Sequence, residues 1–190
     1  MSVKKGTEVA TIDVSLITIR PENDSSADEI ALDTAYSIAV EPQVEMVEAV
    51  KLVIKGVLKA QKRAANTLTG NTITLTNNVF TPELVLMLQG GTITYDSQDP
   101  TKIIKYEPPA AGSSEKGEIF ILSAYSAQYD TSGQIIRYEK ITYPNCQGTP
   151  VAINTEDGVF RVSEYIINSA PKTGESPYII EYVDALPEIA

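Results

Sequence analysis

The residue types that most catalytic sites use are sparse in this chain of 190 residues, which has no His and a single Cys. His is the side chain that most readily exchanges protons near neutral pH, and it is the commonest transition-metal ligand. Its absence excludes most hydrolytic triads. Cys146 lies in the run Tyr-Pro-Asn-Cys-Gln-Gly, and without His nothing in the sequence lowers its pKa. We therefore expect a buried thiol and not a nucleophile.

Carboxylates gather in two places. Residues 22–29 hold Glu22, Asp24, Asp28 and Glu29, which are hard oxygen ligands of the kind Ca²⁺ prefers. They lack the spacing and the turn glycine of an EF-hand loop, so an exposed loop is the favoured interpretation. The pair Glu156-Asp157 would suit a hydrolase, but Gly158 follows it in a pattern typical of a turn.

A phosphate-binding loop is also suggested by spacing and then excluded by residue type. The run from Gly112 to Glu118 has two glycines at the spacing of such a loop. Glu118 and Ile119 stand where the loop needs Lys and then Ser or Thr. The sequence therefore predicts no catalytic residue, no cofactor-binding residue and no metal ligand, and we expect a protein that is not an enzyme.

Composition and charge further narrow the functional class of the protein. The chain has 15 basic and 25 acidic residues and a net charge of −10, which argues against a groove that grips phosphates. A hydrophobic content of 43% is ample for the core of one domain, which we expect to span residues 1–190. No apolar run approaches the ~18 residues of a membrane span, and no signal segment is present, so we expect synthesis in a cytosol and no membrane partner.

The clearest local pattern is a strand, a turn and a short helix between Gly70 and Gly91. Thr residues alternate with Ile73 and Leu75, which indicates a half-buried strand. A helix of residues 82–89 should follow, with the Thr81 oxygen as N-cap and Pro82 at its first position. The two glycines Gly90 and Gly91 end it, and its almost wholly apolar sequence requires cover on several sides.

The segment Val44–Arg63 fits both a helix and a strand. Its many β-branched residues and the central Gly56 favour a long strand. The partner of that strand should be Asn71–Thr76, with the hairpin connection across Ala64–Gly70.

Other segments have the composition or alternation of strands bounded by turn residues. We expect strands within Thr7–Arg20, Ile30–Val40 (ending before Pro42), Glu118–Tyr129, Gln134–Tyr143, Val151–Ile153, Val159–Asn168 and Tyr178–Val183. We expect mobile loops at about 21–29, 64–70 and 107–117, and an N-terminal strand or arm at about 1–20. The fold class is therefore mainly β: an antiparallel β-sandwich or barrel with one short flanking α-helix.

Two groups of residues suggest contacts between subunits. Lys51, Lys55 and Lys59 belong to a stretch that holds five of the 15 basic residues. This stretch fits either a solvated stripe or, in a chain of net charge −10, a contact with acidic residues of a neighbouring copy. The apolar helix adds Leu84 and Leu88, which we expect to seal one sheet against another.

In the order and spacing of three runs, the chain resembles the tail tube proteins (major tail proteins) of long-tailed bacteriophages and prophages of Gram-positive bacteria. The runs are Ala49 to Gly56, Gly70 to Gly91, and Tyr143 through Phe160 to Asp184. The resemblance implies hexameric rings that stack into a hollow tube, located in the virion tail and made in the host cytoplasm. It implies as partners other copies of the chain, a tape measure, a tail terminator and possibly a sheath, with viral DNA passing through without sequence-specific binding. Glu45 and Glu48 are the residues we expect to face that lumen.

Two other classes of tube and one unrelated class fit as alternatives. The tube of a phage-tail-like bacteriocin or of a secretion machine would have the same sequence features. A carbohydrate-binding or cell-surface-binding β-sandwich module would share the strands, although such modules usually expose Trp and this chain has none.

Overall fold

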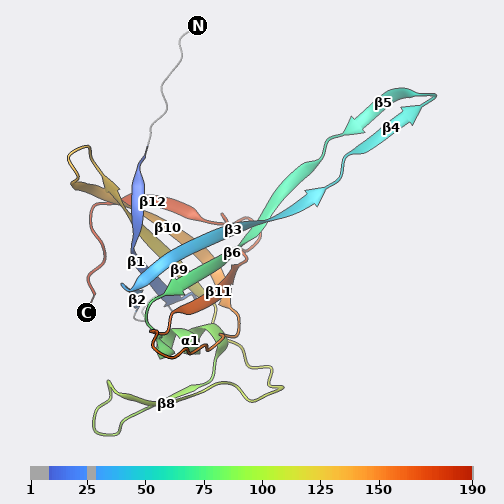
Figure 1. Cartoon of the computed structure of the whole chain (residues 1–190). Helices are drawn as coiled ribbons and strands as arrows, with labels where there is room; N and C mark the ends of the chain where they lie inside the picture. Colours follow the sequence, from blue (N-terminus) through green and yellow to red (C-terminus); the bar gives the residue numbers. More distant parts are fainter. Residues whose placement is uncertain (1–8, 25–28, 190) are drawn as a thin grey trace.

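The computed structural model describes residues 9–24 and 29–189, and it consists of a β-sheet body, one helix and a long projecting arm (Figure 1). The body contains β1 (Thr11–Pro21), β2 (Ile30–Leu32), β3 (Ala35–Val47), β6 (Ala65–Asn77), β9 (Phe120–Tyr129), β10 (Ile135–Gly148), β11 (Ser163–Ser169) and β12 (Ile179–Val183). Outside the body sheet lie β4 (Val50–Ile54), β5 (Val57–Lys62), α1 (Pro82–Gln89), β7 (Thr92–Tyr95) and β8 (Ile103–Glu107).

The body is one antiparallel sheet with the strand order β2-β1-β9-β10-β11-β6-β3, to which β12 adds by pairing with β10. β10 is long enough to take β12 along Tyr138–Thr142 and β11 along Cys146–Gly148. Among the described residues the path has free ends at β2 and β3, so the sheet curls over a core without closing. The prediction of a mainly β, antiparallel, sandwich-like fold with one short helix is confirmed.

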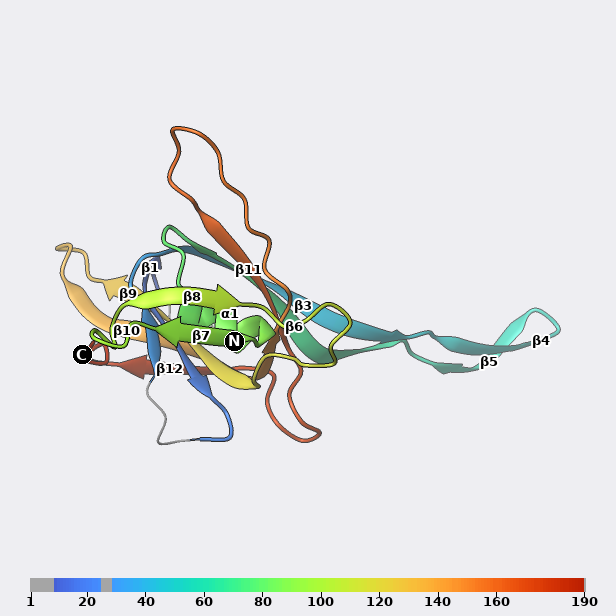
Figure 2. The same cartoon turned by 90° about the horizontal axis from the view of Figure 1, so that it is seen from below.

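The core lies inside the curled sheet and is sealed from below by α1 (Figure 2). Leu84, Val85, Met87 and Leu88 of α1 are buried against aliphatic and aromatic side chains of the strands. The predicted bounds of the helix are confirmed, and Gly90 ends it at φ 80° while its N–H donates to the Leu86 oxygen at 2.8 Å. The prediction that the Thr81 side chain caps the helix is wrong, because it makes no capping hydrogen bond.

The long segment at Val44–Arg63 is β-structure, as favoured, but its predicted pairing is wrong. The chain reverses at Lys55-Gly56, so that β4 pairs with β5, while Asn71–Thr76 pairs with residues 37–42 of β3. Ala64–Gly70 is consequently not a loop, since β6 begins at Ala65 and continues without interruption into the body. Because two residues at positive φ can reverse a strand, Lys55-Gly56 is the feature that sequence analysis should have used.

Smaller corrections concern strand boundaries. Ile30–Val40 is two strands, β2 and β3, and β3 runs through Pro42, which an edge strand tolerates because it has one unpaired side. Val151–Ile153 is not a strand, and the strand predicted from Val159 starts only at Ser163. The β7–β8 hairpin was not predicted at all; it packs below α1 and precedes the irregular segment 108–119.

The remaining predicted strands are present: β9 and β12 lie within their expected ranges, β1 ends one residue later at Pro21, and β10 continues past Tyr143 to Gly148. Residues 1–8 of the expected N-terminal arm and residues 25–28 of the expected acidic loop lie outside the described residues. In the part of the chain that the structure describes, no helix is both long enough and apolar enough to cross a membrane.

Candidate assembly surface on an exposed arm

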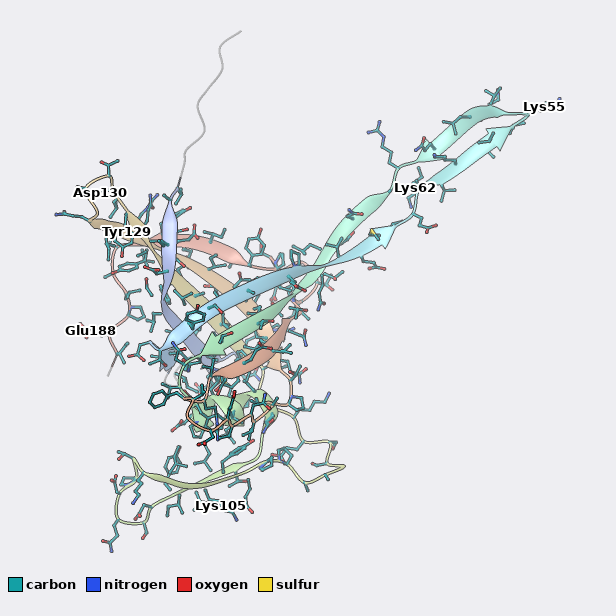
Figure 3. The ribbon with its side chains drawn as sticks, viewed as in Figure 1. Lys55, Lys62, Lys105, Tyr129, Asp130 and Glu188 are labelled. Carbon is teal, nitrogen blue, oxygen red and sulfur yellow. The ribbon has the colours of Figure 1, made fainter. Side chains whose placement is uncertain are left out.

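The arm, defined here as residues 44–69, is a two-stranded ribbon that leaves the body as a continuation of β3 and β6 (Figure 1). The outer ends of these strands pair Val44 with Leu68 and Val47 with Ala65, after which β4 and β5 extend the ribbon to its tip. Lys55 lies at the tip and Lys62 about halfway along (Figure 3). Every residue of the arm is exposed, so the arm makes almost no contact with the body.

The tip is formed by the two residues Lys55 (φ 49°) and Gly56 (φ 78°) between the paired residues Ile54 and Val57. Positive φ at both central residues is the requirement of a type I′ turn, whose twist matches that of a β-hairpin. Glycine meets that requirement without strain, whereas Lys adopts it at a cost. The turn therefore fixes the register of β4 against β5.

The root of the arm has an extra residue in β6 and a hydrogen bond between its two strands. The register of β3 against β6 shifts between Gln43 and Val44. Gln43 pairs with Gly70 and Val44 pairs with Leu68, so Thr69 is the bulged residue. The Thr69 hydroxyl donates to the Gln43 oxygen at 3.1 Å. A bulge of this kind bends a strand and increases its twist. The direction of the arm is thus set where it joins the body.

Apolar side chains cover much of the arm, and nothing in the subunit shields them. Ten large hydrophobic residues are between 36% and 77% exposed: Val44, Met46, Val47, Val50, Leu52, Val53, Ile54, Val57, Leu58 and Leu68. An isolated two-stranded ribbon is at best marginally stable in water, and a contiguous exposed apolar surface usually marks an interaction site. The arm therefore has the properties of a surface that is buried by a partner.

The arm also differs in charge from the rest of the chain. Residues 50–63 contain Lys51, Lys55, Lys59, Lys62 and Arg63 and no acidic residue. With Glu45 and Glu48 the whole arm carries +5 − 2 = +3, and since the chain carries −10, the remainder carries −13. Such a separation of charge within one subunit favours contact between the arm of one copy and the body of another.

The structure separates the predicted contact residues into two groups. Lys51, Lys55 and Lys59 lie on the exposed arm, in β4, at the tip and in β5. Leu84 and Leu88 are fully buried in the core of their own subunit, which leaves them no surface for a neighbour, so their predicted contact role is wrong. Glu45 and Glu48 are exposed near the root of the arm. The lumen position expected for them stays a prediction.

The pairing in β4 and β5 changes how the lysines are arranged. A single long strand would have placed Lys51, Lys55 and Lys59 on one face, but the reversal at the tip distributes them over two strands. Directly opposed residues share a face of a ribbon, and one face carries Val50, Leu52 and Ile54 of β4. The exposed apolar residues of the arm were the signal that sequence analysis missed, and recognising the turn at Lys55-Gly56 would have predicted the hairpin that carries them.

Outside the arm, the candidate chemical groups of the sequence are the Cys146 thiol, the possible metal ligands and the pair Glu156-Asp157. The Cys146 thiol is buried, and burial raises its pKa to about 12, so it is not a reactive thiolate at neutral pH. No cluster of three or more potential metal ligands occurs among residues 9–24 and 29–189. The residues Glu156 and Asp157 lie in an exposed turn.

The Gln89 side chain connects three separate parts of the subunit. Gln89, at the end of α1, donates from Nε2 to the Tyr106 hydroxyl of β8 at 2.8 Å. Its Oε1 accepts from the Val151 N–H at 2.8 Å, and the Tyr106 hydroxyl donates to the Gly90 oxygen at 2.7 Å. Gln89 thereby fixes the β7–β8 hairpin and the start of the segment between β10 and β11 to the helix.

Among the comparisons with known proteins, only the search of solved structures finds similarity to this chain. No protein-family model matches the chain, and no curated protein matches it. Among solved structures, a chain of the cryo-electron microscopy structure of the anti-feeding prophage baseplate aligns with a TM-score of 0.30 and 7% identity, over 96% of this chain and 95% of that chain. A similarity at this TM-score carries no argument about the fold or the function of this chain.

Proposed function

We propose that the chain is a structural subunit of a phage tail tube, which assembles with further copies of itself through the arm. The observation that carries this proposal is the exposed, apolar and basic ribbon at residues 44–69, on a body of opposite charge. The sequence resemblance to tail tube proteins supplies the kind of assembly: hexameric rings stacked into a conduit for DNA. The tube of a phage-tail-like bacteriocin or secretion machine has the same subunit chemistry and is included in the proposal.

A contact between unlike surfaces of two copies is compatible with both closed rings and open stacks of rings. The arm and the body surface that receives it are different parts of the same subunit, so the contact is heterologous and repeats from copy to copy. Burying the arm's apolar residues supplies the driving force, at about 25 cal/mol for each Å² removed from water. The prevailing negative charge of the body would repel the phosphates of passing DNA, provided that acidic residues face the lumen.

The test is a variant in which residues 48–64 are replaced by Asn-Gly. Val47 and Ala65 are opposed partners, so a two-residue turn can join them and retain the β3–β6 pairing at the root. The body lacks contacts with the removed segment, and we expect its thermal unfolding to be unchanged. The variant should stay monomeric by light scattering, while the full chain forms rings or hollow tubes of uniform width in negative-stain electron microscopy.

Two results would contradict the proposal. Tubes formed by the arm-free variant at the same concentration as the full chain would remove the arm from assembly. A full chain that stays monodisperse and monomeric at every concentration would remove self-assembly itself, and would favour the β-sandwich binding module as the function.

A further inference from the structure

A second apolar surface lies on the segment between β10 and β11. This segment, residues 149–162, is called the β10–β11 loop here, and with Glu164 and Ile166 of β11 it forms the loop groove. Phe160 is 93% exposed, and Ile153, Val159, Val162 and Ile166 are exposed as well. Val162, Glu164 and Ile166 line a groove of about 330 Å³ between the loop and the outer face of β11. An adjoining hollow is lined by Val159, Phe160 and Arg161.

The charge of this surface is opposite to that of the arm. Residues 149–166 contain the carboxylates Glu156, Asp157 and Glu164 and one basic residue, Arg161. The Arg161 guanidinium is engaged within the subunit, since it lies 5.0 Å from the centre of the Phe80 ring and donates to the Thr155 hydroxyl at 3.3 Å. The loop groove thus presents apolar side chains among acidic ones.

Another exposed apolar surface of the body carries balanced charges. On β10 and β12 the exposed residues include Ile136, Ile179 and Tyr182. There the Arg137 guanidinium lies 4.1 Å from the centre of the Tyr182 ring, and Lys140 pairs with Glu181 at 3.6 Å. Positive and negative groups are balanced, so a basic ribbon would gain little from docking there.

The loop groove and the arm of one subunit are not placed to meet. Figure 2 shows the arm and the loop that precedes β11 leaving the body in different directions. Contact between them therefore requires two copies of the chain.

We propose that the tip half of the arm, β4 and β5, docks in the loop groove of a second copy of the chain. Lys51, Lys55 and Lys59 then lie among Glu156, Asp157 and Glu164, while Phe160 and Ile166 cover apolar side chains of the ribbon. This inference rests on the proposed function and names the surface that receives the arm. The two matching surfaces on one subunit generate a contact that repeats from copy to copy, in a closed ring or in an open stack.

Variants in which the charges of the arm and of the loop groove are reversed test whether these two surfaces dock. The arm variant carries Lys51→Glu, Lys55→Glu and Lys59→Glu, and the loop variant carries Glu156→Lys, Asp157→Lys and Glu164→Lys. Each variant alone juxtaposes like charges, and we expect the concentration at which half the protein is assembled to rise at least about tenfold. All six residues are exposed, so circular dichroism and thermal unfolding should match the unaltered chain.

Mixing the variants should restore assembly. In an equimolar mixture the acidic arm of one variant meets the basic loop groove of the other, and the unaltered arm of the second meets the unaltered groove of the first. The chain with all six substitutions should also assemble. A control with the same change of net charge as the loop variant, Asp33→Lys, Glu118→Lys and Glu188→Lys, alters exposed acidic residues elsewhere and should assemble like the unaltered chain. Phe160→Ala should weaken assembly without changing the unfolding temperature.

The outcomes separate this inference from the proposed function. If the arm variant fails to assemble while the loop variant assembles normally, or if the mixture is not restored, the arm docks on another surface and the inference is wrong. Normal assembly of the arm variant would also overturn it. Failure of the unaltered chain to assemble would overturn both the inference and the proposed function.

Discussion

Gly70 lies against the backbone of Ser169 so closely that a Cβ on Gly70 would be 2.3 Å from the Ser169 carbonyl oxygen. Gly70 is the first buried residue after the arm, and Ser169 is the last residue of β11. The contact joins the root of the arm to the strand that also forms one wall of the loop groove. The relative placement of the two proposed docking surfaces therefore depends on a position that only glycine can occupy without displacement.

Gly70→Val should destabilise the subunit by about 1–3 kcal/mol, because overpacking against backbone atoms forces the strands apart. Thermal or urea unfolding measures this loss. Assembly should weaken more than stability alone explains, since the arm is redirected. Gly112→Asn is the control: Gly112 has φ 82° and no atom within 4 Å of an added Cβ, and Asn tolerates positive φ. Equal stability of the Gly70→Val variant and the unaltered chain would contradict the close contact.

Gln89→Ala should release the β10–β11 loop and the β7–β8 hairpin from α1. It removes two hydrogen bonds of 2.8 Å, each worth about 1 kcal/mol, and leaves the Val151 N–H without its acceptor. Faster hydrogen exchange at Val151 is the specific readout. Gln89→Glu retains the acceptor oxygen but loses the donor, so it should protect Val151 while disturbing Tyr106. Unchanged exchange at Val151 in Gln89→Ala would show that the loop is held by other contacts.

Stability should fall at alkaline pH in a way that depends on Cys146. Burial raises the pKa of its thiol from 9.0 to about 12 in the folded chain. Between these values the unfolded chain loses the proton while the folded chain retains it, so stability decreases as pH rises through this window and is undiminished by this group below it. Burial also raises the pKa of Tyr143, which acts in the same direction.

Cys146→Ala isolates the thiol contribution because Tyr143 titrates in both proteins. The variant should be less stable than the unaltered chain near pH 8 through loss of packing, by about 1 kcal/mol. That difference should shrink as pH rises from about 9 to about 11, as measured by chemical denaturation at each pH. Parallel pH profiles for the two proteins would show that the thiol does not control the slope.

Lys55→Asn should strengthen the tip of the arm, since Asn-Gly is the preferred sequence of a type I′ turn, by about 0.5–1 kcal/mol. Hydrogen exchange of the β4 and β5 amides should slow. Assembly should nevertheless weaken, because one positive charge of the arm is lost. Gly56→Val has the opposite local effect: Gly56 has φ 78°, and a β-branched residue is strained there. Faster exchange in Lys55→Asn would exclude a type I′ turn.

Sequence reasoning succeeded where a signal was local. The α1 helix has Pro82 at its start, an apolar run and Gly90 at its end, and all of these act within a few residues. β9 and β10 were predicted as alternating segments bounded by turn residues, and in the turn between them the Asp130 carboxylate accepts from the Ser132 and Gln134 N–H groups. Such features can be found without knowledge of the partner strand.

It failed where pairing between distant strands decides the structure. Val151–Ile153 has the composition of a strand but is irregular, and the Val151 N–H donates to the Gln89 side chain and not to a strand. Residues 64–70 are polar, yet β3 continues beside them and recruits them into β6. The arm itself contradicts the expectation that apolar alternation means a buried face, because its apolar residues are exposed in the subunit.

Because the arm is independent of the core, selection for recognition between subunits and selection for folding act on different residues. No residue between Glu41 and Thr69 belongs to the hydrophobic core or packs against it. Substitutions in the arm can therefore alter which subunits recognise one another while the body folds as before. If the proposed docking holds, paired changes in the arm and the loop groove would yield assemblies that exclude each other's subunits, so a new binding specificity could arise without a new fold.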